Sequence, residues 1–387
     1  MRKSSLRILL SAMVAGVPRQ GGIAWIALQY ALGLRRLGHE VLLVEPLDEG
    51  QVRPGRAPLW SCENAAYFRD VVGQFGLEDE ATLLLTGTRE TAGLTYDQVR
   101  DWASRADLLV NIGGGLTDPC LLEPIPVRLY LDLDPGFTQL WQAVEGIDMR
   151  FDGHTHFATV GLTLGQPGSQ VPTCDIDWIP TPQPVVLKEW PLANGIERDA
   201  LTTIANWRGY GSVEVDGILY GQKAHSLRRF IDLPRRTATR FDLALAIDPG
   251  ESQDLAALAE NGWHLIDPAV VTGTPEEYRR FIQGSHGEFG IAKSGYVEAG
   301  CGWFSDRSVC YLASGRPVIA QDTGFGNVLP TGEGLFAFRT SEEVEEAIDE
   351  LARDYGTQRR AARAIAEECF DSDVVLSSLL TRVGLAA

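Results

Sequence analysis

The sequence predicts an α/β protein made of two doubly wound parallel-sheet domains that face each other across a cleft. Buried strands alternate with amphipathic helices in each half of the chain. A proline-rich stretch at residues 167–191 separates the two series, and it can form neither a regular helix nor a central strand. The 387 residues suffice for two domains of about 150 to 200 residues each.

The chain begins with a strand-helix-strand unit. Residues 6–14 form an apolar run typical of a buried parallel strand, and residues 18–22 form its exit loop. Residues 23–37 carry apolar side chains at helical spacing, and Gly38 ends this helix before a second strand at residues 40–44. This order predicts a parallel sheet.

Residues 1–16 also resemble a secretory signal, because Arg2 and Lys3 precede an apolar run. Arg7 interrupts the transition, and the apolar piece at residues 8–14 is short and leads directly into a loop and a helix. We therefore interpret it as a buried first strand. No segment reaches the roughly 18 apolar residues of a membrane span, so we expect a cytoplasmic protein.

The other elements of the first domain continue the alternation. Strands are expected at residues 82–85, 107–112, 128–133 and 157–161, and helices at 63–75, 96–104 and 138–144. In the second half, strands are expected at residues 202–205, 241–247, 262–266, 289–293, 318–320 and 335–338, and helices at 252–260, 275–283 and 344–370. We place an N-terminal domain at 1–190, a C-terminal domain at 191–368 and a final helix at 369–387 that packs back on the first domain.

The most informative stretch is residues 302–334, which predicts loop, helix, turn, strand and loop. Ser308 stands where a helix N-cap is expected, residues 309–312 give a short apolar helix, and Gly315 ends it before a buried strand at 318–320. Such a helix directs unpaired backbone N–H groups and a positive dipole end at whatever lies in front of it. The stretch therefore predicts a diphosphate site.

This order of elements resembles the C-terminal domain of bacterial GT-B-type glycosyltransferases, which use nucleotide sugars. The resemblance covers residues 281–380 and lies in the helix, Gly-Arg-Pro-Val-Ile-Ala at 315–320, a glycine-rich loop and Gly-Glu-Gly-Leu at 332–335. It implies two Rossmann-like domains, a nucleotide-diphosphate sugar as co-substrate, and no cofactor or metal. Many retaining members carry two glutamates separated by seven residues, and the matching positions here are Gly302 and Cys310.

The resemblance implies that the donor binds to the C-terminal domain. The candidate donor-binding residues are Lys223, Trp303, Phe304, Ser305, Asp306, Arg307, Ser308, Thr323, Gly324 and Glu333. Lys223 is either a diphosphate contact or an exposed lysine at a helix start. Arg307 pairs either with a phosphate or with Asp306 on the surface. Glu333 either binds ribose or sugar hydroxyls or is a polar turn residue.

Glycines in the N-terminal domain are candidates for binding the acceptor. Gly21 and Gly22 lie between the first strand and the first helix, where backbone either approaches a ligand closely or forms a plain tight turn. Gly113 and Gly114 close another strand of the same sheet. Glu45 at the end of the second strand mimics the acidic residue of an NAD site, but the glycine spacing of that fingerprint is missing.

Three residues are candidates for the catalytic base, namely Asp134, His154 and His156. The Asp132-Leu133-Asp134 segment has three interpretations: an Asp-x-Asp metal site, a turn, or a cleft carboxylate at Asp134. His154 and His156 alternate just before a strand, and without a third ligand they do not define a metal site. In the resembling superfamily, a histidine at about this point often contacts the sugar or the acceptor.

Composition limits the partners. A net charge of −18 argues against broad binding to nucleic acid or anionic membranes. The six cysteines show neither CxxC pairs nor histidine-linked metal spacing, and the scarcity of lysine draws attention to Lys223 and Lys293. We expect a metal-independent hexosyltransferase acting on a small-molecule acceptor, as a monomer or homodimer, with secondary metabolism as an association only. A nucleotide-sugar epimerase and a non-catalytic sugar-nucleotide-binding protein are the alternatives.

Overall fold

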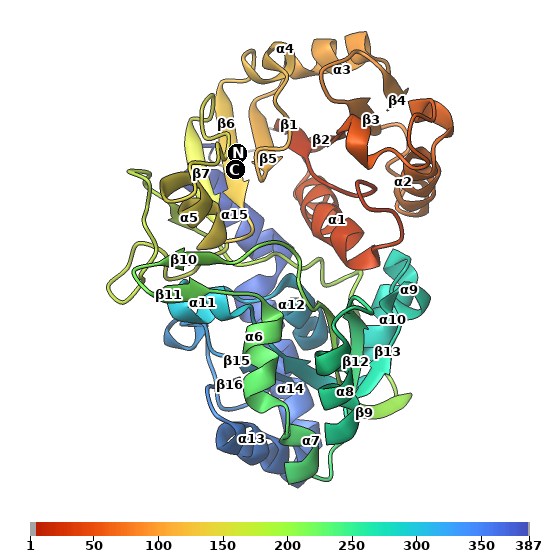
Figure 1. Cartoon of the computed structure of the whole chain (residues 1–387). Coiled ribbons are helices and arrows are strands. Elements are labelled where there is room, and N and C mark those ends of the chain that lie inside the picture. The colour runs from red at the N-terminus through yellow and green to blue at the C-terminus, as the bar shows by residue number, and fades with distance from the viewer. Residues whose placement is uncertain (1–4, 386–387) are drawn as a thin grey trace.

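The computed structural model describes residues 5–385 and confirms an α/β protein with two largely parallel sheets (Figure 1). The strand orders are β4-β3-β2-β1-β5-β6-β7-β8 in the first sheet and β13-β12-β9-β14-β15-β16 in the second. Each sheet winds outward in both directions from its first strand, β1 or β9, which is the doubly wound arrangement. Among the strands of these two sheets in the described part of the chain, β3 and β4 are the one antiparallel pair. Residues 1–4, where part of the signal-like segment falls, and 386–387 lie outside the described residues.

The elements of the first domain have the following bounds. The strands are β1 (Arg7–Ser11), β2 (Glu40–Leu47), β3 (Ala81–Leu85), β4 (Thr91–Gly93), β5 (Leu108–Ile112), β6 (Val127–Asp132), β7 (His156–Thr159) and β8 (Ile179–Pro180). The helices are α1 (Gly21–Arg36), α2 (Glu63–Gln74), α3 (Tyr96–Ala103), α4 (Pro119–Leu122) and α5 (Phe137–Ala143), with short 3₁₀ turns η1 (Glu49–Gln51) and η2 (Leu59–Ser61).

The second domain is built in the same way. Its strands are β9 (Arg198–Asn206), β12 (Phe241–Ala246), β13 (His264–Ile266), β14 (Ser285–Gly290), β15 (Val318–Gln321) and β16 (Leu335–Phe338), with a separate hairpin of β10 (Val213–Val215) and β11 (Ile218–Tyr220). Its helices are α6 (Lys223–Leu227), α7 (Leu233–Arg236), α8 (Ser252–Asn261), α9 (Pro268–Val271), α10 (Pro275–Gly284), α11 (Ser294–Ala299), α12 (Asp306–Ala313), α13 (Ser341–Arg353), α14 (Tyr355–Ile365) and α15 (Ser372–Arg382), with the short helical turns η3 (Arg228–Phe230), η4 (Phe325–Asn327) and η5 (Ala366–Phe370).

The signal-like apolar run is a central strand. Ile8, Leu9 and Leu10 of β1 are fully buried, and β1 pairs in parallel with β2 on one side and β5 on the other. A strand paired on both edges and covered on both faces needs a continuous apolar sequence, which explains the resemblance to a signal. No helix within residues 5–385 is long and apolar enough to cross a membrane.

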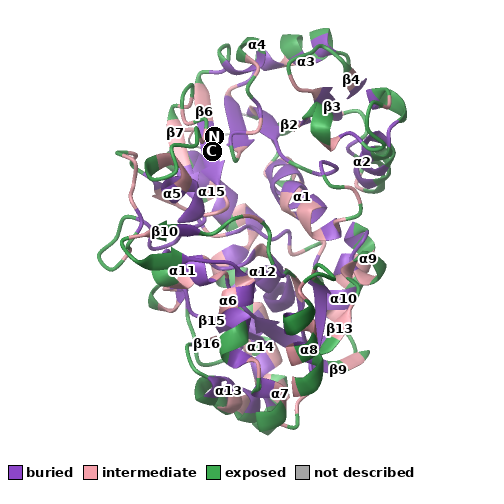
Figure 2. Cartoon of the chain, viewed as in Figure 1, coloured by how far each residue is buried: buried purple, intermediate pink, exposed green. Residues whose placement is uncertain are grey.

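Hydrophobic side chains join the two domains into one packed body. One core cluster combines α1 with α10, α12 and α15, and in it the rings of Trp25 and Trp190 lie 4.9 Å apart. A second cluster joins α5 to α11 and the β10-β11 hairpin. Figure 2 shows buried residues running through α1 and α12 at the junction of the domains. The packing between the domains is therefore largely apolar at these two clusters.

The last helix, α15, lies on the first domain against α1 (Figure 1). A Cβ on Gly33 of α1 would lie only 2.5 Å from Leu376 Cδ1 of α15, so glycine permits this close approach. Arg36 and Asp373 form an ion pair of 3.2 Å between the same two helices. The end of the chain thus ties the second domain to the first.

Three expected elements differ most from the structure. The strand expected at residues 289–293 lies earlier in the chain, as β14 at Ser285–Gly290, and residues 291–293 form the loop before α11. The helix expected at residues 344–370 is divided into α13, α14 and the π-helical turn η5, because Asp354 leaves helical geometry and caps α14 with a hydrogen bond from the Thr357 amide. The helix expected to begin after Ser308 begins at Asp306, with Ser305 as its N-cap. Ser308 therefore lies inside the first turn of α12.

Candidate functional site

The N-terminus of α12 is sealed in this structure. Ser305 Oγ accepts a hydrogen bond from the Arg307 amide at 3.2 Å, which satisfies one of the free N–H groups of the first turn. Ser305 and Ser308 are 4% and 2% exposed. The cavity beside them has a volume of about 10 Å³, which barely accommodates one water molecule. The expectation that this bend opens onto a space for a pyrophosphate is therefore not met in this conformation.

A segment from the first domain contacts the residues that precede α12. Thr163 follows β7, and its amide and side-chain Oγ1 donate to Cys301 O at 3.2 Å and to Gly300 O at 2.8 Å. Leu162 N donates to Gly302 O at 3.3 Å, and Trp303 forms an isolated bridge with Gly161. These contacts, one of which comes from the Thr163 side chain, cross the domain boundary and hold the segment before α12 against the first domain.

Neither position of the glutamate pair faces a ligand. Gly302 has a φ of 72°, and a Cβ there would lie 2.6 Å from Thr163 Oγ1, so the segment from the first domain occupies the space of any side chain. Cys310 is buried on α12, where its Sγ accepts a weak hydrogen bond from Gln29 Nε2 of α1 at 3.9 Å. Burial raises the pKa of the Cys310 thiol. Both positions serve domain packing in this structure.

Arg307 does not pair with Asp306. Its Nε donates to Glu288 Oε1 at 2.6 Å and its Nη1 donates to Ile204 O at 2.7 Å. The side chain is 8% exposed and its partner Glu288 is fully buried. Burial raises the pKa of the Asp306 carboxyl, with Arg307 acting in the opposite direction. Arg307 is thus fixed beneath the carboxyl edge of the second sheet.

Lys223 is a cation without a carboxylate partner. It is the first residue of α6, and its Nζ donates to Ile291 O at 3.0 Å and lies 5.4 Å from the centre of the Trp303 ring. Across residues 5–385, none of the ion pairs involves Lys223. Burial, together with Arg307 and Lys293, lowers the pKa of its ammonium group. A desolvated ammonium group of this kind favours an anionic ligand.

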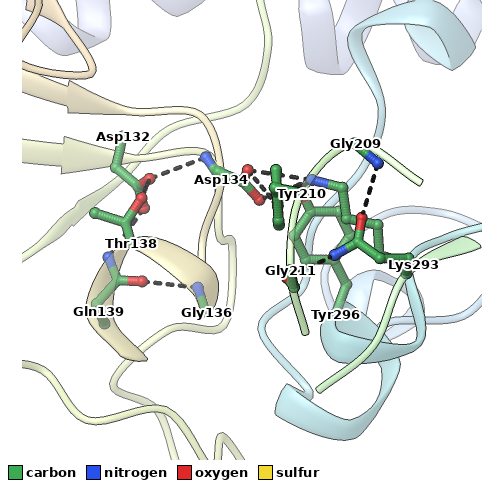
Figure 3. Close-up of polar contacts among 11 residues, drawn as sticks. Asp132, Asp134, Gly136, Thr138, Gln139, Gly209, Tyr210, Gly211, Lys293 and Tyr296 are labelled. Atoms are coloured by element: carbon green, nitrogen blue, oxygen red, sulfur yellow. Dashed lines mark hydrogen bonds and ion pairs between the residues drawn. The ribbon is translucent and has the colours of Figure 1, made fainter. Parts of the chain in front are cut away.

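Asp134 meets three donors from the second domain (Figure 3). Lys293 Nζ lies 3.2 and 3.1 Å from its two carboxylate oxygens, and the hydroxyls of Tyr210 and Tyr296 donate to the same carboxylate. Asp134 follows β6, Tyr210 follows β9, and Lys293 follows β14, so three strands deliver this cluster from their carboxyl ends. The pKa of Lys293 is lowered by burial, which the charge of Asp134 partly offsets.

Asp132 has a structural position. Its oxygens accept hydrogen bonds from Thr138 Oγ1 at 2.7 Å and Thr159 Oγ1 at 2.8 Å. Gln139 Nε2 and the Asp134 amide donate to it as well, at 3.0 and 2.9 Å. These donors fill the carboxylate and fix the turn between β6 and α5, on which Asp134 stands. The described part of the chain contains no group of three or more His, Cys, Asp or Glu placed to hold a metal ion.

The two candidate histidines lie apart from Asp134. His156 begins β7 and pairs with Leu129, whereas Asp132 pairs with Thr159 at the other end of these strands. The Nε2 of His154 accepts from Asn111 Nδ2 at 3.1 Å when its Nδ1–H donates to Phe151 O at 3.2 Å. Burial lowers the pKa of His154. Its ring packs on Tyr130, so the observed contacts of His154 lie within the first domain.

The glycines at α1 contact the second domain. A Cβ on Gly21 would lie 2.2 Å from Thr274 O, and one on Gly22 would lie 2.8 Å from the Tyr278 ring. Both glycines thus allow the N-terminus of α1 to approach α10. Gly114 lies against Tyr130 of its own sheet, with only 2.8 Å between a Cβ and the ring, whereas Gly113 faces open space. An acceptor role remains a prediction for all four.

Glu45 holds the loop that follows β1. Its buried carboxylate accepts hydrogen bonds from Ala15 N at 2.9 Å and Gly16 N at 2.6 Å. Burial raises the pKa of Glu45 to about 7, although these hydrogen bonds act against the rise. The acidic residue that mimics an NAD site therefore orders a backbone loop in this structure.

The remaining donor candidates are dispersed. Phe304 is buried, with its ring stacked on Phe370, and Glu333 is exposed. Thr323 and Gly324 line a groove of about 570 Å³ between the domains. Trp303 stacks on Tyr296 with 4.5 Å between ring centres. Of the predicted residues, the structure brings Lys223, Trp303 and Asp134 to the contact between the two sheets.

Sequence reasoning missed the partners of Asp134. The scarcity of lysine was a signal for Lys293, and Tyr210 stands between two glycines at the end of a predicted strand. Nothing in the local sequence distinguishes Tyr296, which lies on α11.

Comparisons with known proteins support the fold. No protein-family model matches the sequence, and no curated protein matches it. An α-glucosyltransferase solved with UDP and a 13-mer DNA has a TM-score of 0.58 at 12% identity, over 98% of this chain and 100% of its own. HepE of Anabaena, solved with UDP and glucose, has a TM-score of 0.57 at 12% identity, over 98% of this chain and 99% of its own. A sucrose-phosphate synthase of Thermosynechococcus elongatus has a TM-score of 0.53 at 9% identity, over 98% of this chain and 99% of its own. The chain therefore has the GT-B fold.

Proposed function

We propose that this protein is a glycosyltransferase that moves a hexosyl group from a nucleotide-diphosphate sugar to a small-molecule acceptor. The observation that carries the proposal is the side chain of Lys223, which lies at the carboxyl edge of the second sheet against Ile291 O and the Trp303 ring and has no carboxylate partner among the described residues. Ser294 Oγ, also buried in this region, has no hydrogen-bond partner. Ligands of doubly wound sheets bind at this edge.

The fold supports the same reaction. Two of the solved structures with this fold, the α-glucosyltransferase and HepE, hold UDP. A diphosphate bound at Lys223 would raise the affinity of that amine for its proton, because an adjacent anion favours the charged form. Lys223 would then stabilise the charge that develops on the leaving diphosphate, which is the main catalytic contribution that we assign to the second domain.

Asp134 is the base in this proposal. Its carboxylate takes the proton of the acceptor hydroxyl while the acceptor oxygen forms a bond to the anomeric carbon. The bond from that carbon to the diphosphate oxygen breaks, and its electron pair leaves with the nucleoside diphosphate. Asp134 lies at the contact between the domains beside Lys293, whereas His154 is held by Asn111 and Phe151 of its own domain, which supports Asp134 as the base.

Donor entry requires the domains to separate. Thr163 contacts the 300–301 segment across the domain boundary, and about 10 Å³ of space remains beside α12; both observations support a closed arrangement. Closure around a bound donor would exclude water from the reacting centre. The net charge of −18 favours a small-molecule acceptor over a polyanion such as DNA.

A thermal-shift panel of UDP, ADP, GDP and dTDP tests donor binding. We expect one of these nucleotides to raise the melting temperature of the protein and Lys223→Gln to remove most of that rise, whereas Lys188→Gln, at an exposed lysine, leaves it unchanged. Product analysis with labelled donor sugars then tests turnover. Transfer that needs an added acceptor supports the proposal. Isomerisation without acceptor indicates an epimerase, binding without turnover indicates a sugar-nucleotide-binding protein, and no binding at all overturns the nucleotide site.

A further inference from the structure

Lys293 pairs with the carboxylate of Asp134 in this structure and lies near the proposed site of the donor diphosphate. We infer that Lys293 is a second ligand of the donor diphosphate. In the donor-free protein Lys293 pairs with Asp134; when the donor binds, Lys293 pairs with the diphosphate instead, and Asp134 becomes free to act as the base. This inference rests on the proposed function and adds a coupling between the two sites. The structure shows the donor-free pairing, in which Lys293 Nζ lies 3.1 Å from Asp134 Oδ2 across the domain boundary.

The charge of the expected diphosphate requires a second cation at the domain boundary. A nucleoside diphosphate ester carries about two negative charges, and one ammonium group leaves such an anion undercompensated in a desolvated site. Arg307 is held by Glu288 and by Ile204 O beneath the sheet edge. Arg208, which is more exposed, pairs with Glu251 at 2.5 Å. Of Lys223, Arg307, Arg208 and Lys293, Lys293 is the one that pairs with a carboxylate of the opposite domain.

The geometry brings Lys293 and Lys223 to one aromatic stack. Tyr296 and Trp303 stack with 4.5 Å between ring centres. Lys293 Nζ lies 5.0 Å from the centre of the Tyr296 ring, and Lys223 Nζ lies 5.4 Å from that of Trp303. Lys223 is held by the carbonyl of Ile291, two residues before Lys293 in the same loop. The Lys223 ammonium group on α6 thus contacts the same loop after β14 that carries Lys293.

Once the domains have closed on the donor, the transfer itself needs only a side-chain movement. Lys293 is the N-cap residue of α11, so its backbone is fixed by a helix start. Its four-carbon stem and three donor hydrogens allow it to exchange one oxyanion for another without a change of backbone. The two tyrosine hydroxyls keep contact with Asp134 and hold its carboxylate in place after the lysine has left.

The exchange links donor binding to proton acceptance. While Lys293 contacts both oxygens of Asp134, at 3.2 and 3.1 Å, an acceptor hydroxyl has to compete with an ammonium group for the same lone pairs. Transfer of Lys293 to the diphosphate removes this competitor only when a donor is present. The base is therefore exposed to acceptor only in the complex that has a sugar to transfer.

Calorimetric titration of UDP, with ADP, GDP and dTDP in parallel, tests the inference on four proteins: the wild type, Lys293→Gln, Asp134→Asn and the double variant. We expect Lys293→Gln to weaken binding about tenfold, since a charge-assisted hydrogen bond is lost. We expect Asp134→Asn to tighten it at least about fivefold, because Lys293 no longer has to leave a carboxylate. The double variant should bind like Lys293→Gln, since Asp134 then has no lysine to retain.

Matched controls and a second substitution complete the experiment. Lys188→Gln and Asp349→Asn change exposed residues and should leave the affinity unchanged. Asp134→Ser serves where Asp134→Asn fails to fold, and it should tighten binding in the same direction. Unchanged or weaker binding by the Asp134 variants overturns the inference while the proposed function stands. Failure of the wild type to bind any of the four nucleotides overturns both.

Discussion

Gly302 and Thr163 are in contact across the domain boundary, and the space for a side chain on Gly302 is filled by the Thr163 backbone and hydroxyl. A Cβ at this glycine would lie 2.6 Å from Thr163 Oγ1 and 2.7 Å from Thr163 N. The position that matches a glutamate in the resembling superfamily is thus occupied by the opposite domain. In this structure, domain closure and a side chain at residue 302 exclude each other.

Gly302→Ala should therefore destabilise the protein through two effects. The φ of 72° strains any residue with a Cβ, and the contact with Thr163 adds steric repulsion. Gly332→Ala is the matched control, because Gly332 has a φ of 106° and open space around it. We expect a loss of about 3 kcal/mol in the free energy of unfolding for Gly302→Ala and about 1 kcal/mol for Gly332→Ala, measured by urea unfolding. Equal losses of stability for the two variants would show that Thr163 moves away from a Cβ at residue 302 at no energetic cost.

Lys223→Met should change how stability depends on pH. The pKa of Lys223 is lowered well below 10.5, chiefly by burial, so the folded state binds this proton less readily than the unfolded state. Stability that depends on Lys223 therefore rises as the pH increases from the folded pKa toward 10.5. We expect the wild type to gain stability between pH 8 and 10 relative to Lys223→Met in thermal melts. Lys188→Met, at an exposed lysine, should follow the wild type, and parallel curves for Lys223→Met would contradict a desolvated ammonium group.

Glu45→Gln should reduce the dependence of the free energy of unfolding on pH between pH 5 and 8. The pKa of Glu45 rises from 4.5 to about 7 in the folded state because of burial, so the carboxyl stabilises the fold below pH 4.5 and this contribution is lost as the pH rises through 7. The linked change is about 3 kcal/mol. We expect the difference in unfolding free energy between Glu45→Gln and the wild type to grow in favour of the variant from pH 5 to 8.

Glu78→Gln is the control for this measurement, since Glu78 is exposed. Its profile should match that of the wild type over the same pH range. A difference between Glu45→Gln and the wild type that stays constant with pH would mean that the hydrogen bonds from Ala15 and Gly16 hold the carboxylate ionised.

Sequence periodicity was sufficient for the architecture and for one half of the site. The apolar run of β1 and the helical spacing of α1 predict the parallel sheet, because a buried strand paired on both edges has to be apolar along its length. Asp134 was predicted from its place after a strand. Its partner Lys293 is 159 residues away, and only the packing of the two domains brings them together.

The sequence could not predict whether the N-terminus of α12 is open to a ligand or covered. The loop-to-helix pattern before α12 indicates N–H groups for an anion, but the pattern does not report what covers them. The segment around Thr163 follows a strand of the other domain and contacts 300–302 through two backbone amides and the Thr163 hydroxyl. Backbone contacts of this kind leave no signature in the sequence. The same holds for Gly21 and Gly22, whose conformational freedom serves contact with α10 in the structure.

Asp132→Asn should separate a structural carboxylate from a metal ligand. Asp132 accepts hydrogen bonds from Thr138, Gln139, Thr159 and the Asp134 amide, so an amide in its place directs an N–H group at donors. We expect a loss of about 2 to 3 kcal/mol in the free energy of unfolding, measured by urea unfolding, with no change in the response of the melting temperature to Mg²⁺ or Mn²⁺. Asp349→Asn, on the exposed face of α13, should lose almost nothing. A stable Asp132→Asn protein that has lost a stabilisation by Mn²⁺ present in the wild type would restore the Asp-x-Asp metal interpretation and remove Asp132 from the turn that positions Asp134.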